Sequence, residues 1–251
     1  MRTLSELQRL YDGYVTGYRE PNGNLPEMMQ LKFVHTAKVV ENAVAIAEGE
    51  SFDAPTCAVA LAAALFHDIG RYEQLRRFDT FRDSDSVDHA VFSHDILKEK
   101  GWVDEPAVLK AVLYHNRRDL PDDMDALTAA GSHTVRDADK LDIFRVLEDQ
   151  VAHTDWRKDT RAFWNLAVSA PPNPVVVACI ENRRPVDYQN IKALADFVLI
   201  QVGWMISGLH YATTRRLCRE RGHLAYRRNF MHKLTDDPAI DRICDLAEKE
   251  L

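Results

Sequence analysis

Apolar residues recur at helical spacing through most of this chain, and this periodicity constrains the fold more than any other feature. The first run places Leu4, Leu7, Tyr11 and Tyr14 three or four residues apart, which puts them on one face of a helix. Similar runs follow and end at glycine or proline. Strand signals are few; residues 175–177 carry the best one, and it is also compatible with a helix. The pattern therefore predicts an all-α fold.

Turn and capping residues divide the chain into expected helices. These cover residues 4–14, 26–48, 54 to a stop at Gly70, 86–100, 106–115, 132–151, 155–164, one or two helices over 186–221, and 238–251. Residues 71–85 are expected to form a polar, irregular connection, and residues 117–125 a loop. The prolines at 171–174 are the strongest break but do not establish a second domain. We expect a single domain over residues 1–251, with its core at about 26–150 and a C-terminal helical extension at about 151–251.

The charge balance restricts the expected partners. Lys and Arg number 32 against 39 Asp and Glu, so the net charge is -7. An acidic chain is a poor binder of nucleic acid, whose affinity for proteins rests largely on phosphate neutralisation. The longest apolar run, residues 197–209, is interrupted by Gln201 and is too short to span a membrane. We therefore expect neither nucleic acid nor a membrane as partner.

The N-terminus and the cysteines indicate the compartment. The first residues turn polar at once and lack the apolar core of a signal peptide. Cys57, Cys179, Cys218 and Cys244 are far apart, a spacing more typical of reduced thiols than of a disulfide framework. We expect a cytoplasmic protein.

A His-Asp pair at the end of an apolar helix is the sharpest chemical signal. His67 and Asp68 follow an alanine-rich run. An ionised carboxylate buried without a partner costs several kcal/mol or more, and a divalent cation bound by both side chains would offset that cost. The dipeptide alone is weak evidence, because His94-Asp95 repeats it.

The order of the histidines and aspartates strengthens the signal. His35 lies in a long helix, His67-Asp68 comes next, and His89, His115 and Asp139 follow. With Ile69-Gly70-Arg71 after the pair and Lys140-Leu141 after the last aspartate, this order resembles the HD-domain superfamily of metal-dependent phosphohydrolases. The resemblance covers roughly residues 26–150.

The resemblance implies a ligand set. His35, His67, Asp68 and Asp139 would bind one metal, and His89 and His115 would hold a second, with Asp68 bridging. The neighbouring residues that compete for these roles are His94 for His89, and Asp137 and Asp142 for Asp139; Asp142 also suits a supporting position beside the metal ligands. A mixed imidazole and carboxylate set suits Fe, Mn, Co, Ni or Zn, one or two per chain.

The resemblance also implies an activity, the hydrolysis of a small phosphomonoester or nucleotide by metal-activated water. Asp68, Arg71 and Lys140 are the expected catalytic residues; Arg71 would contact phosphate, and Lys140 would either contact phosphate or support the metal ligands. The other arginines near the motifs are weaker candidates: Arg76, Arg77, Arg82, Arg117 and Arg118. Two alternatives stay open: a di-iron oxygenase of the same superfamily, and a regulatory module that binds metal or nucleotide without turnover. The oligomeric state is unknown.

Overall fold

The structure is a computed structural model that describes residues 2–158, 163 and 165–251. Within these ranges the chain is helical and forms no β-strand; one isolated bridge joins Ala167 and Ala193. The all-α prediction is thus confirmed. The strand signal at residues 175–177 lies inside helix α8, Pro174–Glu181, where Asn173 caps the first turn.

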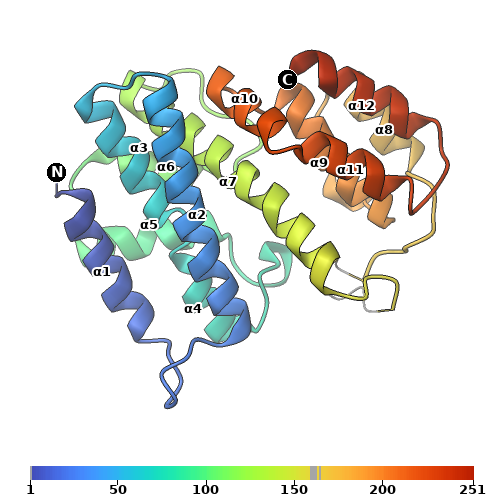
Figure 1. The fold of residues 1–251 in the computed structure, drawn as a ribbon. Coiled ribbons are helices and arrows are strands. Elements are labelled where there is room, and N and C mark those ends of the chain that lie inside the picture. Colours follow the sequence, from blue (N-terminus) through green and yellow to red (C-terminus); the bar gives the residue numbers. More distant parts are fainter. Residues whose placement is uncertain (1, 159–162, 164) are drawn as a thin grey trace. The chain divides into compact units, whose positions relative to one another are not determined.

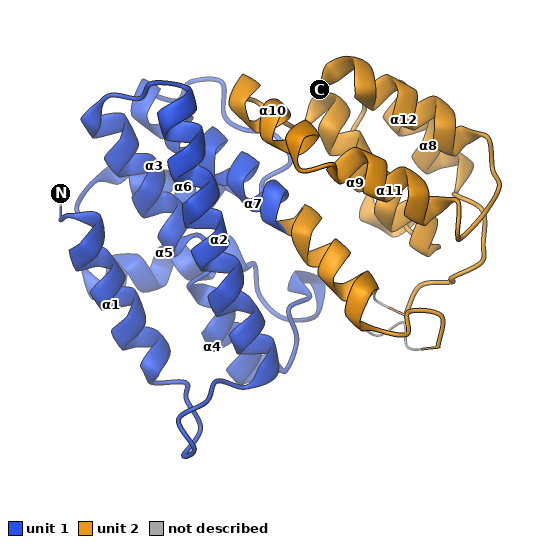
Figure 2. Cartoon of the chain, viewed as in Figure 1, with its two compact units in different colours: residues 1–142 blue, residues 143–251 orange. Residues whose placement is uncertain are grey.

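The chain divides into two compact units, residues 1–142 and 143–251 (Figure 2). The boundary falls within helix α7, Ala126–His153. The single domain expected from the sequence stays a prediction.

Unit 1 is built from helices that follow the predicted order (Figure 1). They are α1 Leu4–Thr16, α2 Glu27–Gly49, α3 Ala54–Phe66, α4 Gly70–Phe78, the short 3-10 turn η1 Asp83–Asp85, α5 His89–Lys100, α6 Pro106–Tyr114 and the first part of α7. Helix α3 lies at the centre and contacts α1, α2 and α6. Its alanines Ala60, Ala62, Ala63 and Ala64 are fully buried, and such small side chains let neighbouring helices approach closely.

Helix α4 corrects one prediction from the sequence. Residues 71–85 were expected to be irregular, but α4 covers the first part of that segment. Glu73 binds Arg76 and Arg77, three and four residues on, a spacing that stabilises helices. Tyr72, in the first turn of this helix, is buried. Arg76 and Arg77 therefore belong to a helix and are paired within it.

Gly70 explains why a helix begins directly after the His-Asp pair. Its backbone N–H donates to Ser93 Oγ of α5 at 2.9 Å. A Cβ on residue 70 would lie 2.8 Å from the Ser93 backbone nitrogen, closer than side chains tolerate. Glycine thus allows the start of α4 to pack against α5.

Unit 2 contains the rest of α7 and the helices after it. They are α8, the 3-10 turn η3 Tyr188–Asn190, α9 Leu194–Ser207, α10 Ala212–Glu220, α11 His223–Met231 and α12 Ala239–Glu250. Helix α11 was not predicted, and α9 contacts α8, α11 and α12. The helix or half-turn predicted over 155–164 falls partly on residues 159–162 and 164, outside the described residues. None of the described helices has the length and apolar character of a membrane span.

Candidate metal centre

Six side chains predicted as metal ligands converge inside unit 1. They are His35 from α2, His67 and Asp68 after α3, His89 at the start of α5, His115 at the end of α6, and Asp139 from α7. Their potential ligand atoms form two groups, His35–His67–Asp139 and Asp68–His89–His115, and the atoms of each group lie within 4.8 Å of one another. Five of the six residues are buried, and Asp139 is partly exposed. Segments far apart in the sequence thus deliver the predicted set to one place.

Asp68 faces both groups with its two carboxylate oxygens. Its Oδ2 lies 3.7 Å from Nε2 of His35 and 3.6 Å from Nε2 of His67. Its Oδ1 lies 3.6 Å from Nε2 of His89 and 3.9 Å from Nε2 of His115. This is the arrangement of a carboxylate that could bridge two cations.

The imidazole rings present their Nε2 atoms to one another at short distances. Nε2 of His89 and Nε2 of His115 are 3.0 Å apart, and those of His35 and His67 are 3.3 Å apart. Two nitrogen lone pairs at such distances repel each other unless a proton or a metal ion lies near them. The donor set therefore fits a cation in each group.

Every ring uses its other nitrogen, Nδ1, to donate a hydrogen bond. His67 donates to the carbonyl of Ala64 at 2.8 Å, and His115 donates to that of Val112 at 2.7 Å. Both carbonyls belong to the last turn of a helix, where backbone acceptors lack a partner in the helix. These bonds fix the tautomer and leave Nε2 free for a metal.

The remaining two histidines donate to carboxylates. His35 Nδ1 lies 2.6 Å from Asp142 Oδ2, and His89 Nδ1 lies 2.5 Å from Asp83 Oδ2. The sequence indicates a supporting position for Asp142 beside the metal ligands, and its contact with His35 agrees with that role. Asp83 was not singled out. It lies six residues before His89 in a segment that was expected to be irregular, so the sequence held no signal for this pairing.

The charges around His35 favour its protonated form when no metal is present. Burial and the neighbouring Lys32 lower the pKa of His35, but hydrogen bonds with Asp139 and Asp142 outweigh them and raise it. Burial tends to raise the pKa of Asp139, yet the interactions with His35 and His67 bring it below its ordinary value. A proton on His35 therefore partly takes the place of a positive ion.

Burial favours the neutral form of His67 and of His115. Burial lowers the pKa of His67, and burial together with His89 and His67 holds the pKa of His115 well below its usual range. Burial opposes ionisation of Asp68, but the cations around it, led by Lys32, hold its pKa well below the ordinary value. Neutral imidazoles beside ionised carboxylates are the state in which these groups bind metals.

Two cationic side chains contact the central carboxylate. Lys32 Nζ lies 2.6 Å from Asp68 Oδ2, and Arg71 Nε lies 3.3 Å from Asp68 Oδ1. The side chains of Lys32 and Arg71 are 18% and 13% exposed, and that of Asp139 is 21% exposed. Solvent therefore reaches the centre beside these three residues. Lys32 was missed, although it stands one helical turn before His35 on α2.

The other predicted residues lie in different surroundings. Lys140 donates to the carbonyl of Arg136, and burial lowers its pKa to about 8. Arg76 and Arg77 bind Glu73, while Arg82 pairs with Asp85 and Arg118 with Asp119 at exposed positions. His94, the rival of His89, binds its neighbour Asp95. The catalytic roles of Lys140 and Arg71 stay predictions.

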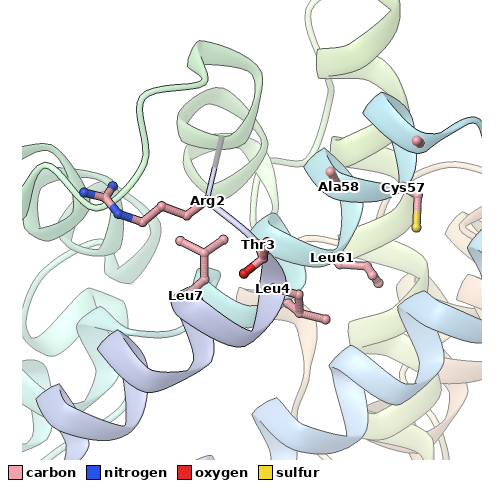
Figure 3. A pocket seen from close by; sticks show the side chains of 8 residues that line it. Arg2, Thr3, Leu4, Leu7, Cys57, Ala58 and Leu61 are labelled. Carbon is pink, nitrogen blue, oxygen red and sulfur yellow. The ribbon is translucent and has the colours of Figure 1, made fainter.

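A pocket of about 290 Å³ lies elsewhere in unit 1. Its lining is Arg2, Thr3, Leu4, Leu7, Ala54, Cys57, Ala58 and Leu61 (Figure 3). It shares no residue with the histidine cluster, and its walls are mostly apolar. Arg2 donates to the carbonyls of Gly101 and Trp102, so its charge is already engaged. The convergence of ligating atoms identifies the metal centre better than the volume of this pocket.

Comparison with known proteins agrees with this geometry. The sequence model of the HD domain family matches residues 33–143. The matched segment contains all six side chains of the centre. Neither the curated proteins nor the solved structures gave a significant match.

Proposed function

We propose that this chain is a metal-dependent phosphohydrolase that acts on a small phosphomonoester or nucleotide, because the HD domain family model matches residues 33–143. HD domains bind divalent metals, and the two groups of ligand atoms fit that chemistry. The observation that carries the proposal is the placement of Asp68, whose two oxygens face two different pairs of histidines.

The bound metals would be Fe, Mn, Co, Ni or Zn, since imidazole and carboxylate ligands suit these ions. When bound, such ions lower the pKa of coordinated water and withdraw charge from a phosphoryl oxygen. The chain itself holds the ligand atoms in place through the four Nδ1 hydrogen bonds described above.

The side chains at the exposed side of the centre suit an anionic substrate. Lys32 and Arg71 carry positive charge next to Asp68 and are partly reached by solvent. Ammonium and guanidinium groups bind phosphate oxygens strongly. We propose that these two residues contact the substrate phosphate and stabilise the charge that develops on it, with Lys140 as a further contact.

The test is turnover of a broad panel of phosphomonoesters and nucleotides by the protein loaded with each of the five metals. We expect hydrolysis by at least one metal form and a loss of at least 100-fold in Asp68→Asn, because that change weakens both groups at once. Asp95→Asn, in the His-Asp pair on the surface, is the matched control and should keep full activity. A panel without any turnover would overturn the proposal.

A di-iron oxygenase is the second candidate, and the same bridging position of Asp68 favours it. Four histidines and two aspartates could hold two irons as well as two hydrolytic metals. Oxygen consumption by the iron form that depends on substrate would support this candidate. A protein that hydrolyses phosphoesters with other metals and consumes no oxygen would eliminate it.

A further inference from the structure

The segment between α4 and α5, residues 79–88, is tied to α4 by two side chains. Arg71 donates through Nη1 to the carbonyl of Phe81 at 2.7 Å and to Asp83 Oδ1 at 2.9 Å. Gln74 donates through Nε2 to Asp83 Oδ1, Ser86 Oγ and the carbonyl of Val87, at 2.8 to 3.1 Å. Gln74 is fully buried, so the position of this segment is strongly determined.

The two oxygens of Asp83 have separate partners. Oδ1 accepts from both Arg71 and Gln74, whereas Oδ2 accepts from His89 Nδ1 at 2.5 Å. A carboxylate has no hydrogen to donate, so the proton between Asp83 and His89 belongs to Nδ1. In the neutral imidazole, Nε2 is then the nitrogen without a proton, and it faces Asp68 Oδ1 at 3.6 Å and His115 Nε2 at 3.0 Å.

We propose that Asp83 is a positioning residue of the metal centre, which fixes the tautomer and orientation of His89 and thereby determines whether the Asp68–His89–His115 group holds a metal. This inference rests on the proposed metal centre and deepens it. Arg71 and Gln74 act through Asp83, because they hold its carboxylate in register with His89. Arg71 also contacts Asp68 Oδ1, the oxygen that faces His89 and His115, so it touches both carboxylates beside this group.

A different interpretation would make Asp83, Asp88 and His89 a third cation site, because their ligand atoms also lie close together. The hydrogen bonds argue against it. Asp88 Oδ1 caps α5 by accepting from the backbone of Ala90 and Val91, and it also accepts from Asn116. Asp83 is already bound by three donors. Asp88 therefore caps α5, and Asp83 binds His89.

The decisive variant is Asp83→Asn. The amide oxygen will face the donors of Arg71 and Gln74, because Arg71 is permanently charged and the two donors act together. The amide NH₂ then faces His89 and favours the tautomer with the proton on Nε2, which cannot bind a metal. Asp83→Ala removes the acceptor without imposing the wrong tautomer. We therefore expect Asp83→Asn to weaken metal binding by the Asp68–His89–His115 group more than Asp83→Ala does. If Asp83 served packing alone, Asp83→Ala would be the more damaging change.

Two measurements test this without any substrate. The first is a Mn²⁺ titration; the expected results are two sites in the wild-type protein and a 10- to 100-fold weaker second site in Asp83→Asn, in line with other residues that orient metal ligands. The second is the long-range ¹H–¹⁵N spectrum of the histidines in the metal-free protein. We expect the Nδ1–H tautomer of His89 in the wild-type protein and the Nε2–H tautomer in Asp83→Asn.

Asp85→Asn is the matched control, since Asp85 lies two residues on in the same turn and pairs with the exposed Arg82. It should behave as the wild-type protein in both measurements. The inference is overturned if Asp83→Asn keeps wild-type Mn²⁺ binding or the wild-type His89 tautomer, or if Ala is the more harmful change. An inactive phosphoester panel would count against the proposed function and would leave these two readouts unchanged.

Discussion

At the scale of single residues, the centre depends on which nitrogen of each histidine carries the proton. All four rings donate from Nδ1, two to helix carbonyls and two to carboxylates. The two carbonyl acceptors belong to the backbone and cannot be removed by changing a side chain. The two carboxylate acceptors, Asp142 and Asp83, can be substituted. They offer the cleanest tests of how the chain prepares its ligands.

Asp142→Asn should weaken metal binding by the His35–His67–Asp139 group. The carboxylate accepts from His35 Nδ1 at 2.6 Å, and loss of such a partner typically reduces metal affinity about 10- to 100-fold. Competition with a chelator of known affinity measures the change. Asp149→Asn, on the exposed side of the same helix, is the control. Equal affinities in the two variants would contradict this role of Asp142.

A partly buried carboxylate stabilises unit 2. Glu148 Oε1 accepts from His223 Nδ1 at 2.7 Å and from Arg227 Nη1 at 2.8 Å, and Arg227 is completely buried. Burial tends to raise the pKa of Glu148, but His223 and Arg227 bring it below its ordinary value of 4.5. Removing the charge would leave the guanidinium without its counterion.

Glu148→Gln should therefore lower the free energy of unfolding by about 1–3 kcal/mol at pH 7. Because the pKa of Glu148 is lower in the folded than in the unfolded state, its charge stabilises the fold fully above pH 4.5. This contribution is lost as the pH falls below that value, so the two proteins should converge there. Urea unfolding at several pH values measures the difference. Glu220→Gln, in an exposed pair with Arg216, should change stability little, and a pH-independent deficit in Glu148→Gln would refute the assignment.

The six side chains that converge could be picked out from the sequence, whereas two of the residues that contact them could not. His35, His67, Asp68, His89, His115 and Asp139 appear in a motif order that can be read along the chain. Lys32 and Asp83 contact Asp68 and His89 through tertiary contacts, and a single lysine on a helix or an aspartate in a polar stretch is ordinarily a solvated surface residue. Their roles depend on distances that no spacing rule contains.

At the scale of the helices, the close approach of α4 and α5 depends on Gly70. Gly70→Ala would place a Cβ 2.8 Å from the Ser93 backbone, and such overpacking costs about 1–3 kcal/mol. Gly13→Ala, in α1, meets nothing within 4 Å and should be neutral or stabilising by about 1 kcal/mol. Chemical denaturation of both variants tests this. A Gly70→Ala protein as stable as Gly13→Ala would contradict the packing described.

The two misjudged helices share a physical cause. In α4 the sequence is dominated by arginines, and the pairing of Glu73 with two of them becomes visible only once the helix exists. In α11 the buried face carries His223 and Arg227 in addition to Phe230 and Met231. A charged residue in the core breaks the apolar periodicity from which helices are predicted. The sequence of α11 therefore indicates a helix only weakly.

At the scale of the whole molecule, helical periodicity was sufficient to predict the all-α architecture. The division at residues 142 and 143 was not predictable, because it falls inside the continuous helix α7. The proline-rich break at 171–174, by contrast, only marks the start of α8. Proline, glycine and capping residues indicate where helices begin and end. Compact units, by contrast, are defined by contacts between residues that are distant in the sequence.

The measurement that tests the central claim most directly is metal content per chain, by mass spectrometry on protein purified without chelator and without oxygen. We predict two equivalents of transition metal in the wild-type protein, and one equivalent in each of His35→Ala and His115→Ala, since each belongs to a different group. Protein that holds no tightly bound transition metal, or the same amount in all three forms, would contradict the account.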